Sequence, residues 1–183
     1  LGEELPPVFL GPITAWDCMA ALATSAETTL NVMDIRAGRA GAQMIVDPAT
    51  NVSHFYAGKY IDSKLCRISG ASSTDVGAEL INPLFARLAA SWMGDDGFLL
   101  SLNRRRLCAT ALGDTVAAKG RVTGKRSAGG EHVVDIRAYI EDMRGYVTNI
   151  CELSVALPCR STSSGGDLES PPARAAFEIG ERF

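Results

Sequence analysis

The chain has 183 residues, of which 46% are hydrophobic and 21% are charged, with 18 basic and 21 acidic side chains and a net charge of −3. These values predict a soluble globular protein of one domain, or of one domain with a tail. They exclude the excess of basic residues that is typical of proteins that bind nucleic acid.

Residues 11–27 (GPITAWDCMAALATSAE) predict the first helix, since Thr14 can cap it with Asp17 three residues later. Its apolar residues recur at helical spacing: Trp16, Met19, Ala20 and Ala23. Residues 27–47 are expected to be extended on either side of a glycine-rich break. Residues 48–75 are less regular and end in a loop at 69–75.

The strongest helical pattern lies in residues 81–94 (INPLFARLAASWMG). Asn82 can cap this helix, Pro83 suits its first turn, and Gly94 can end it. One side carries a continuous apolar stripe that consists of Leu84, Phe85, Leu88, Ala89 and Trp92. A stripe of this width predicts a core helix that packs against a sheet.

The remainder up to residue 158 alternates between apolar and polar residues, which predicts strands. Turns are expected at Gly113-Asp114 and Arg144-Gly145. The inward residues are expected to be His132, Val134, Ile136, Ala138 and Ile140 in one strand and Val147, Cys151, Leu153, Val155 and Leu157 in the next. Consecutive strands with short turns form an antiparallel meander, so the predicted fold class is α+β.

Residues 159–174 are rich in Ser, Gly and Pro and resemble a linker. The tail, residues 175–183, ends in IGERF, which is similar to LGEEL at residues 1–5. We therefore expect a domain at 1–158, a linker-like segment, and a tail that begins a second repeat.

The five cysteines are odd in number and form no Cys-x-x-Cys or Cys/His cluster, so neither a disulfide framework nor a metal site is expected. The N-terminal residues lack the pattern of a signal peptide, and no apolar run reaches the length of a membrane span. We expect a cytoplasmic protein without a membrane partner.

Three motifs carry a family resemblance: Gly113-Asp114-Thr115-Val116, Gly120-Arg121-Val122-Thr123-Gly124, and Gly145 followed by Val155-Ala156-Leu157-Pro158. With the long helix before them, they resemble the MaoC-like hydratase/dehydratase family. The resemblance covers residues 80–158 well and residues 1–26 more loosely.

This resemblance implies the hot-dog fold, in which a curved antiparallel sheet wraps around one long helix. It also implies pairing with a second hot-dog unit, either as a homodimer or as a paired domain. The implied substrate is an acyl thioester of coenzyme A or of an acyl carrier protein, and no further cofactor is expected.

The family's acid–base pair is an Asp and a His five residues later, written Asp-x-Asn-Pro-x-His. Five residues before the two histidines, His54 and His132, lie Ala49 and Ser127, so the spacing is not kept. One placement aligns Glu27 with the Asp of the motif. Val32 then stands where the motif has its His, so this placement lacks the catalytic histidine. The other uses Asn51 and His54 as the second half of the motif.

In this second placement the carboxylate is Asp47, seven residues before His54. We prefer it, because His54 is the one histidine in the region where such a site could lie. Set against this, a lone histidine is commonly a surface residue, Asp47 before Pro48 commonly starts a turn, and Glu27 is most simply solvated.

Further candidates lie beside the long helix. By the resemblance, the backbone at Gly77 and Ala78 would polarise the thioester carbonyl. Arg104 could contact a coenzyme A phosphate, since Arg104 and Arg106 share one face of a strand and Arg105 the other. In a hot-dog thioesterase, an acidic residue such as Asp75 or Glu79 would direct water at the carbonyl.

We therefore expect an enzyme, an enoyl-thioester hydratase or dehydratase (a lyase), with Asp47 and His54 as the displaced pair. The alternatives are a catalytically silent hot-dog half that supports an active partner, a thioesterase, and a scaffold recruited for another reaction.

Overall fold

The computed structural model describes residues 1–24, 44–71, 74–128 and 131–158. Glu27, the predicted extended residues 27–43, the linker-like segment and the tail lie outside them. The elements in chain order are β1 (Glu4–Leu10), α1 (Ala15–Thr24), β2 (Met44–Asp47), β3 (Val52–Phe55), η1 (Tyr56–Tyr60), α3 (Ser63–Ile68), α4 (Ala78–Met93), β4 (Phe98–Arg106), β5 (Val116–Ala128), β6 (Glu131–Asp142) and β7 (Val147–Leu157).

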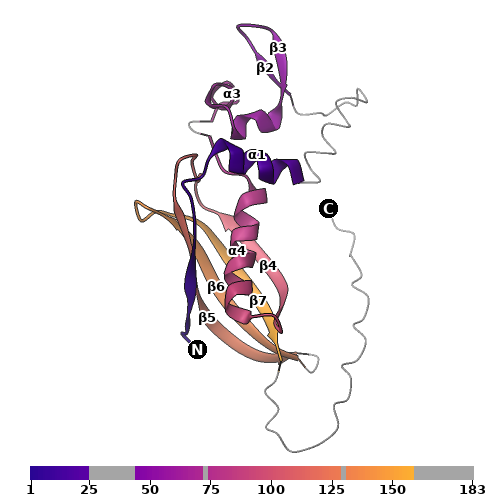
Figure 1. Cartoon of the computed structure of the whole chain (residues 1–183), viewed down its shortest axis with the longest axis vertical. Helices are drawn as coiled ribbons and strands as arrows, with labels where there is room; N and C mark the ends of the chain where they lie inside the picture. The colour runs from indigo at the N-terminus through magenta and orange to yellow at the C-terminus, as the bar shows by residue number, and fades with distance from the viewer. Residues whose placement is uncertain (25–43, 72–73, 129–130, 159–183) are drawn as a thin grey trace, which may run out of the picture.

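A five-stranded antiparallel sheet in the order β1-β5-β6-β7-β4 curves around α4 (Figure 1). The predicted meander is correct for β5, β6 and β7. It is wrong for β4, which pairs with β7 at the edge of the sheet instead of with β5. Alternation within a strand shows which residues share a face, but it does not identify the neighbouring strand, and residues 107–115 connect two strands that are not neighbours.

The core lies between α4 and the sheet, as the apolar stripe predicted. Ile81, Leu84, Phe85, Leu88 and Ala89 are buried on the helix side. The sheet contributes inward residues from its three central strands, which include Ala118, Val122, Ile136, Ala138, Ile140, Cys151, Leu153 and Val155. Each large side chain buried here contributes about 1.5–3 kcal/mol to folding.

The helix α4 begins at Ala78 with Gly77 at its N-cap, one turn before the predicted cap at Asn82. Pro83 therefore lies inside the helix, where it has no N–H to donate to the carbonyl of Glu79. Ile81 and Leu84 are buried on either side of Pro83, and this packing holds the additional turn in place. Tertiary contacts here override the local helix signal.

The capping of α1 agrees with the prediction. The N–H of Asp17 donates to Thr14 Oγ1 at 3.3 Å, and the N–H of Thr14 donates to Asp17 Oδ2 at 2.7 Å. The helix does not bury its predicted stripe, however, since Trp16 is 77% exposed and Cys18 is the buried residue.

The predicted inward face of β6 is confirmed from Val134 to Ile140, but His132 at its start is exposed. In β7, Asn149 rather than Val147 continues the inward row of Cys151, Leu153 and Val155. The register between β6 and β7 shifts at Ile140 and Glu141, which moves Val147 out of the alternation.

The segment from β2 to α3 forms a second group of elements at the N-terminal end of α4 (Figure 1). The strands β2 and β3 form a hairpin that contacts α3, and α3 contacts η1. Asp62 caps α3 by accepting a hydrogen bond from the N–H of Lys64 at 2.7 Å. Residues 48–75 were predicted to be irregular, and they contain these short elements.

Candidate active site

A cavity of about 340 Å³ lies at the N-terminal end of α4. Three parts of the chain form it: η1, the end of α3 with the loop that follows, and the C-terminal end of β4. Its lining consists of Lys59, Tyr60, Cys66, Gly70, Ala71, Asp75, Arg106 and Ala109. Asp75, three residues before the helix, is the carboxylate in this lining.

Asp75 is fixed from two directions. Its carboxylate forms an ion pair with Arg106 and accepts a hydrogen bond from the N–H of Thr110 at 3.2 Å. Its side chain is 15% exposed, whereas that of Arg106 is 54% exposed. Burial raises the pKa of Asp75, although the charge of Arg106 and the N–H of Thr110 act against this rise.

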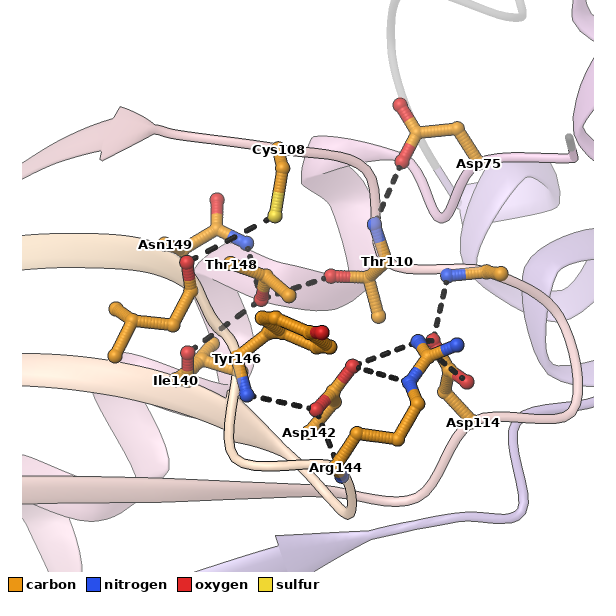
Figure 2. A network of polar contacts seen from close by, with 12 residues as sticks. Asp75, Cys108, Thr110, Asp114, Ile140, Asp142, Arg144, Tyr146, Thr148 and Asn149 are labelled. Carbon is orange, nitrogen blue, oxygen red and sulfur yellow. Dashed lines mark hydrogen bonds and ion pairs between the residues drawn. The ribbon is translucent and has the colours of Figure 1, made fainter. Parts of the chain in front are cut away.

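A buried polar network extends from Asp75 into the sheet (Figure 2). Thr110 Oγ1 donates to Thr148 Oγ1 at 3.0 Å, and Asn149 Nδ2 donates to the same Thr148 oxygen at 3.2 Å. Asn149 Oδ1 in turn accepts a hydrogen bond from Arg104 Nη1 at 2.8 Å. Because Thr110, Thr148 and Asn149 are each only 1% exposed, these bonds hold the loop after β4 in one position.

A second polar cluster in Figure 2 explains the Gly113-Asp114 motif as a structural feature. Arg144 joins Asp142 at 2.6 Å and Asp114 at 3.2 Å, and so connects the β6–β7 turn to the turn before β5. Burial alone would raise the pKa of Asp142, but hydrogen bonds from Tyr146 and Arg144 lower it. Gly113 has φ 90°, a conformation that favours glycine.

The N-terminus of α4 offers backbone donors beside Asp75. Gly77 provides no side-chain cap, and the N–H groups of Ala78 and Glu79 have no preceding helical turn to bond. Among the described residues, Glu79 Oε2 is buried without a hydrogen-bond partner. Burial raises the pKa of Tyr60, the charge of Lys59 opposes this rise, and the charges of Glu79 and Asp75 add to it.

The two residues predicted as the displaced acid–base pair lie on the hairpin. His54 in β3 is opposite Ile45, and Asp47 at the end of β2 is opposite Val52. The two side chains therefore belong to adjacent cross-strand pairs on one face of the hairpin. No hydrogen bond joins them in the part of the chain that the structure describes, and neither lines the cavity.

Asp47 has structural partners. Its carboxylate accepts hydrogen bonds from Lys64 Nζ at 2.5 Å and from the N–H of Ala49 at 2.9 Å. The hydrogen bond from Lys64 is the main cause that lowers the pKa of Asp47 to about 2. Asn51, with φ 55°, lies in the same turn, to which Asp47 is also connected through its backbone carbonyl.

The other candidates are distributed as follows. Gly77 and Ala78 lie at the start of α4, next to Asp75 and Glu79. Arg104 and Arg106 share one face of β4, as the alternation predicted, and their side chains bind Asn149 and Asp75. The ion pair of Asp75 with Arg106 was not predicted, since no local pattern relates residues 31 positions apart.

Within the described ranges, no group of three or more His, Cys, Asp or Glu side chains is placed to hold a metal ion. No helix in these ranges combines the length and apolarity that a membrane span requires.

No protein-family model matches the chain, and no curated protein matches it in sequence. Solved structures do match. The (R)-hydratase from A. caviae involved in PHA biosynthesis is 15% identical with a TM-score of 0.59, and the match covers 86% of this chain and 96% of that one. The MaoC-like dehydratase from Rhodospirillum rubrum is 13% identical with a TM-score of 0.57, covering 86% and 91%.

A chain of the ChsH1-ChsH2 complex from Mycobacterium tuberculosis is 16% identical with a TM-score of 0.58, and the match covers 86% of this chain and 98% of that one. At these identities the likeness concerns the fold. The chain has the hot-dog fold of the MaoC-like and (R)-hydratase structures, as the sequence motifs predicted.

Proposed function

We propose that this hot-dog protein adds water to, or removes water from, an enoyl thioester of coenzyme A or of an acyl carrier protein, with Asp75 as its acid–base group. The observation that carries the proposal is the position of Asp75, a largely buried carboxylate in the cavity wall three residues before α4. Burial raises the pKa of this carboxyl group, and a carboxyl group with a perturbed pKa in a cavity is a candidate acid–base group. The hydratases and dehydratases of the same fold support this reaction class.

The N–H groups of Ala78 and Glu79 would hold the thioester carbonyl oxygen. Negative charge develops on this oxygen when water adds to the β-carbon, and the positive end of the helix dipole stabilises it. Asp75, as the carboxylate, takes the proton of the attacking water while the new C–O bond forms. The electron pair of the double bond moves toward the carbonyl and then takes a proton at the α-carbon.

Glu79 is the group that we assign to the proton at the α-carbon. Its Oε2 is buried against Gly77, outside the cavity lining, and has no hydrogen-bond partner among the described residues, so the side chain would have to turn toward the cavity to reach a ligand. The reverse sequence removes water, and the reaction consumes nothing except the thioester and water. Lys64 and the N–H of Ala49 already bind the Asp47 carboxylate, which argues against Asp47 as the base in this chain.

The sheet leaves two outer strands, β1 and β4. Pro6 and Pro7 in β1 have no N–H to donate, and the strand has an irregular register between Leu5 and Val8. We therefore propose that a second hot-dog unit, another copy or a partner domain, pairs along β4. The pairing of two proteins in the ChsH1-ChsH2 complex is consistent with this arrangement.

The same geometry also favours a second candidate, thioester hydrolysis. If Asp75 or Glu79 directs water at the carbonyl carbon held by the α4 N–H groups, the C–S bond breaks and a free thiol is released. The two reactions differ in product. Hydration leaves the thioester intact and removes the conjugated double bond.

The test is to incubate the purified chain with crotonyl-CoA and to follow enoyl absorbance and free thiol in parallel. We expect loss of absorbance without thiol release. Thiol release would establish the hydrolase instead. If neither the enoyl absorbance nor the free thiol changes while coenzyme A still binds, the chain is a catalytically inactive hot-dog unit that supports an active partner.

A further inference from the structure

Lys59 is a cation of the cavity for which the described residues provide no acidic partner. Its Nζ lies 3.6 Å from the centroid of the Tyr56 ring and 5.0 Å from that of Tyr60, and it donates a hydrogen bond to Tyr56 Oη. No carboxylate among the described residues forms an ion pair with it. The other cation, Arg106, is already paired with Asp75.

The aromatic surroundings of Lys59 stabilise its charge only in part. A cation–π contact stabilises the ammonium group less than a charge-assisted hydrogen bond to an anion does when water is excluded. Tyr60, whose phenol pKa is raised by burial, shows that this side of the cavity is partly desolvated. An ammonium group in such surroundings favours an anionic ligand.

The lining supports a polar ligand over a long hydrocarbon chain. Four of the eight lining residues carry a charge or a hydroxyl group: Lys59, Tyr60, Asp75 and Arg106. Because Lys59 and Asp75 line the same cavity, and the charge of Lys59 lowers the pKa of Asp75, an anion bound by Lys59 would lie close to the reacting carbons.

We propose that the acyl group of the substrate ends in a carboxylate, and that the Lys59 ammonium binds this carboxylate while Asp75 acts on the double bond. This rests on the proposed function and narrows its substrate to short dicarboxylic enoyl thioesters. Tyr56 holds Lys59 in position through its hydroxyl group and ring.

The test compares fumaryl-CoA with crotonyl-CoA, since the first carries a carboxylate where the second carries a methyl group. We expect the wild-type protein to favour fumaryl-CoA in kcat/KM by about tenfold or more, as a charge-assisted contact implies. In Lys59→Met this selectivity ratio is lost, and in Lys59→Arg most of it remains. Lys64→Met, whose lysine pairs with Asp47 outside the cavity, leaves the ratio unchanged.

An equal loss on both thioesters in Lys59→Met would overturn the proposal, because it would assign Lys59 to a phosphate of coenzyme A. A wild-type protein without preference would overturn it as well, while leaving the hydratase function intact. If neither thioester reacts, the proposed function fails separately, and the affinities of fumaryl-CoA and crotonyl-CoA for wild type and Lys59→Met, measured by calorimetry, still decide the role of Lys59.

Discussion

The carboxylate of Asp75, three residues before α4, forms an ion pair with Arg106, the last residue of β4. This contact joins the start of the central helix to an outer strand of the sheet, at the wall of the cavity. Burial raises the pKa of Asp75, and the positive charge of Arg106 works against it. We therefore expect Arg106 to set the pH range in which Asp75, the proposed base, is ionised.

In Arg106→Met, the pKa of Asp75 is expected to rise further, because the opposing positive charge is removed while burial remains. Since Asp75 accepts a proton only when ionised, the acid limb of the profile of kcat/KM against pH moves to higher pH. Arg105→Met is the matched control, because Arg105 lies on the opposite face of β4. A limb that stays in place in Arg106→Met, or moves equally in Arg105→Met, contradicts this role.

The pair of Asp47 and Lys64 predicts an acid-dependent stability. The folded pKa of Asp47 is about 2, against an ordinary value of 3.8. Between these values the unfolded state binds a proton that the folded state does not, so the free energy of unfolding falls as the pH falls. The contribution is complete above about pH 4 and is lost as the pH approaches 2.

Urea unfolding between pH 2 and pH 5 measures this contribution. In Lys64→Met the dependence of stability on pH becomes shallower in this window, because the main cause of the lowered pKa is gone. Lys125→Met, an exposed lysine of β5, serves as the control. An unchanged slope in Lys64→Met would show that the turn alone holds the Asp47 carboxylate.

Gly120 permits the close approach of α4 to the sheet. A Cβ atom at this position would lie 3.3 Å from Leu88 Cδ2 and 3.4 Å from Ala138 Cβ. Gly120→Ala is therefore expected to cost about 1–3 kcal/mol by overpacking, and Leu88→Ala about 2–5 kcal/mol by leaving a cavity. In the double variant the added methyl group occupies part of that cavity, so the combined loss is smaller than the sum.

Denaturant unfolding of the wild type, the two single variants and the double variant gives the four free energies of unfolding that this double-mutant cycle requires. Strict additivity would show that Gly120 and Leu88 do not share their packing.

Asn149 is the buried amide that connects β7 to β4. Asn149→Leu removes the acceptor of Arg104 and the donor to Thr148, and should reduce the free energy of unfolding by about 1–3 kcal/mol. Asn103→Leu, on the exposed face of β4, is the control. A loss in Asn149→Leu no larger than in Asn103→Leu would mean that the network adds no stability.

The sequence predicted those helices and strands in which the apolar pattern repeats over several helical turns or several strand residues. The apolar stripe of α4 and the inward row of β6 were visible because each repeats at least four times. The six residues of α3 are too few for such a pattern, and β4 was misplaced because alternation does not identify neighbouring strands. The inward position of Asn149 was not predicted, because a polar residue is expected on the outward face of a strand. Its burial is explained by the hydrogen bond from Arg104, which only the structure shows.

At the candidate site, the sequence named Asp75, Glu79, Gly77 and Ala78, because they cluster near the helix start. It ranked Asp47 and His54 above them on motif spacing. The spacing of residues within one segment does not reveal partners that lie elsewhere in the chain. Asp47 pairs with Lys64, 17 residues away, and Asp75 pairs with Arg106, 31 residues away, and only the folded structure brings these side chains together.

The measurement that tests the central claim most directly is kcat/KM for the hydration of crotonyl-CoA by wild type, Asp75→Asn and His54→Gln. The asparagine keeps the shape of the side chain and removes its ability to accept a proton, so we expect a loss of about 10²–10⁴-fold. His54→Gln is expected to remain close to the wild type, since His54 does not line the cavity. Loss of hydration in His54→Gln with Asp75→Asn fully active would contradict the account and assign the chemistry to the hairpin.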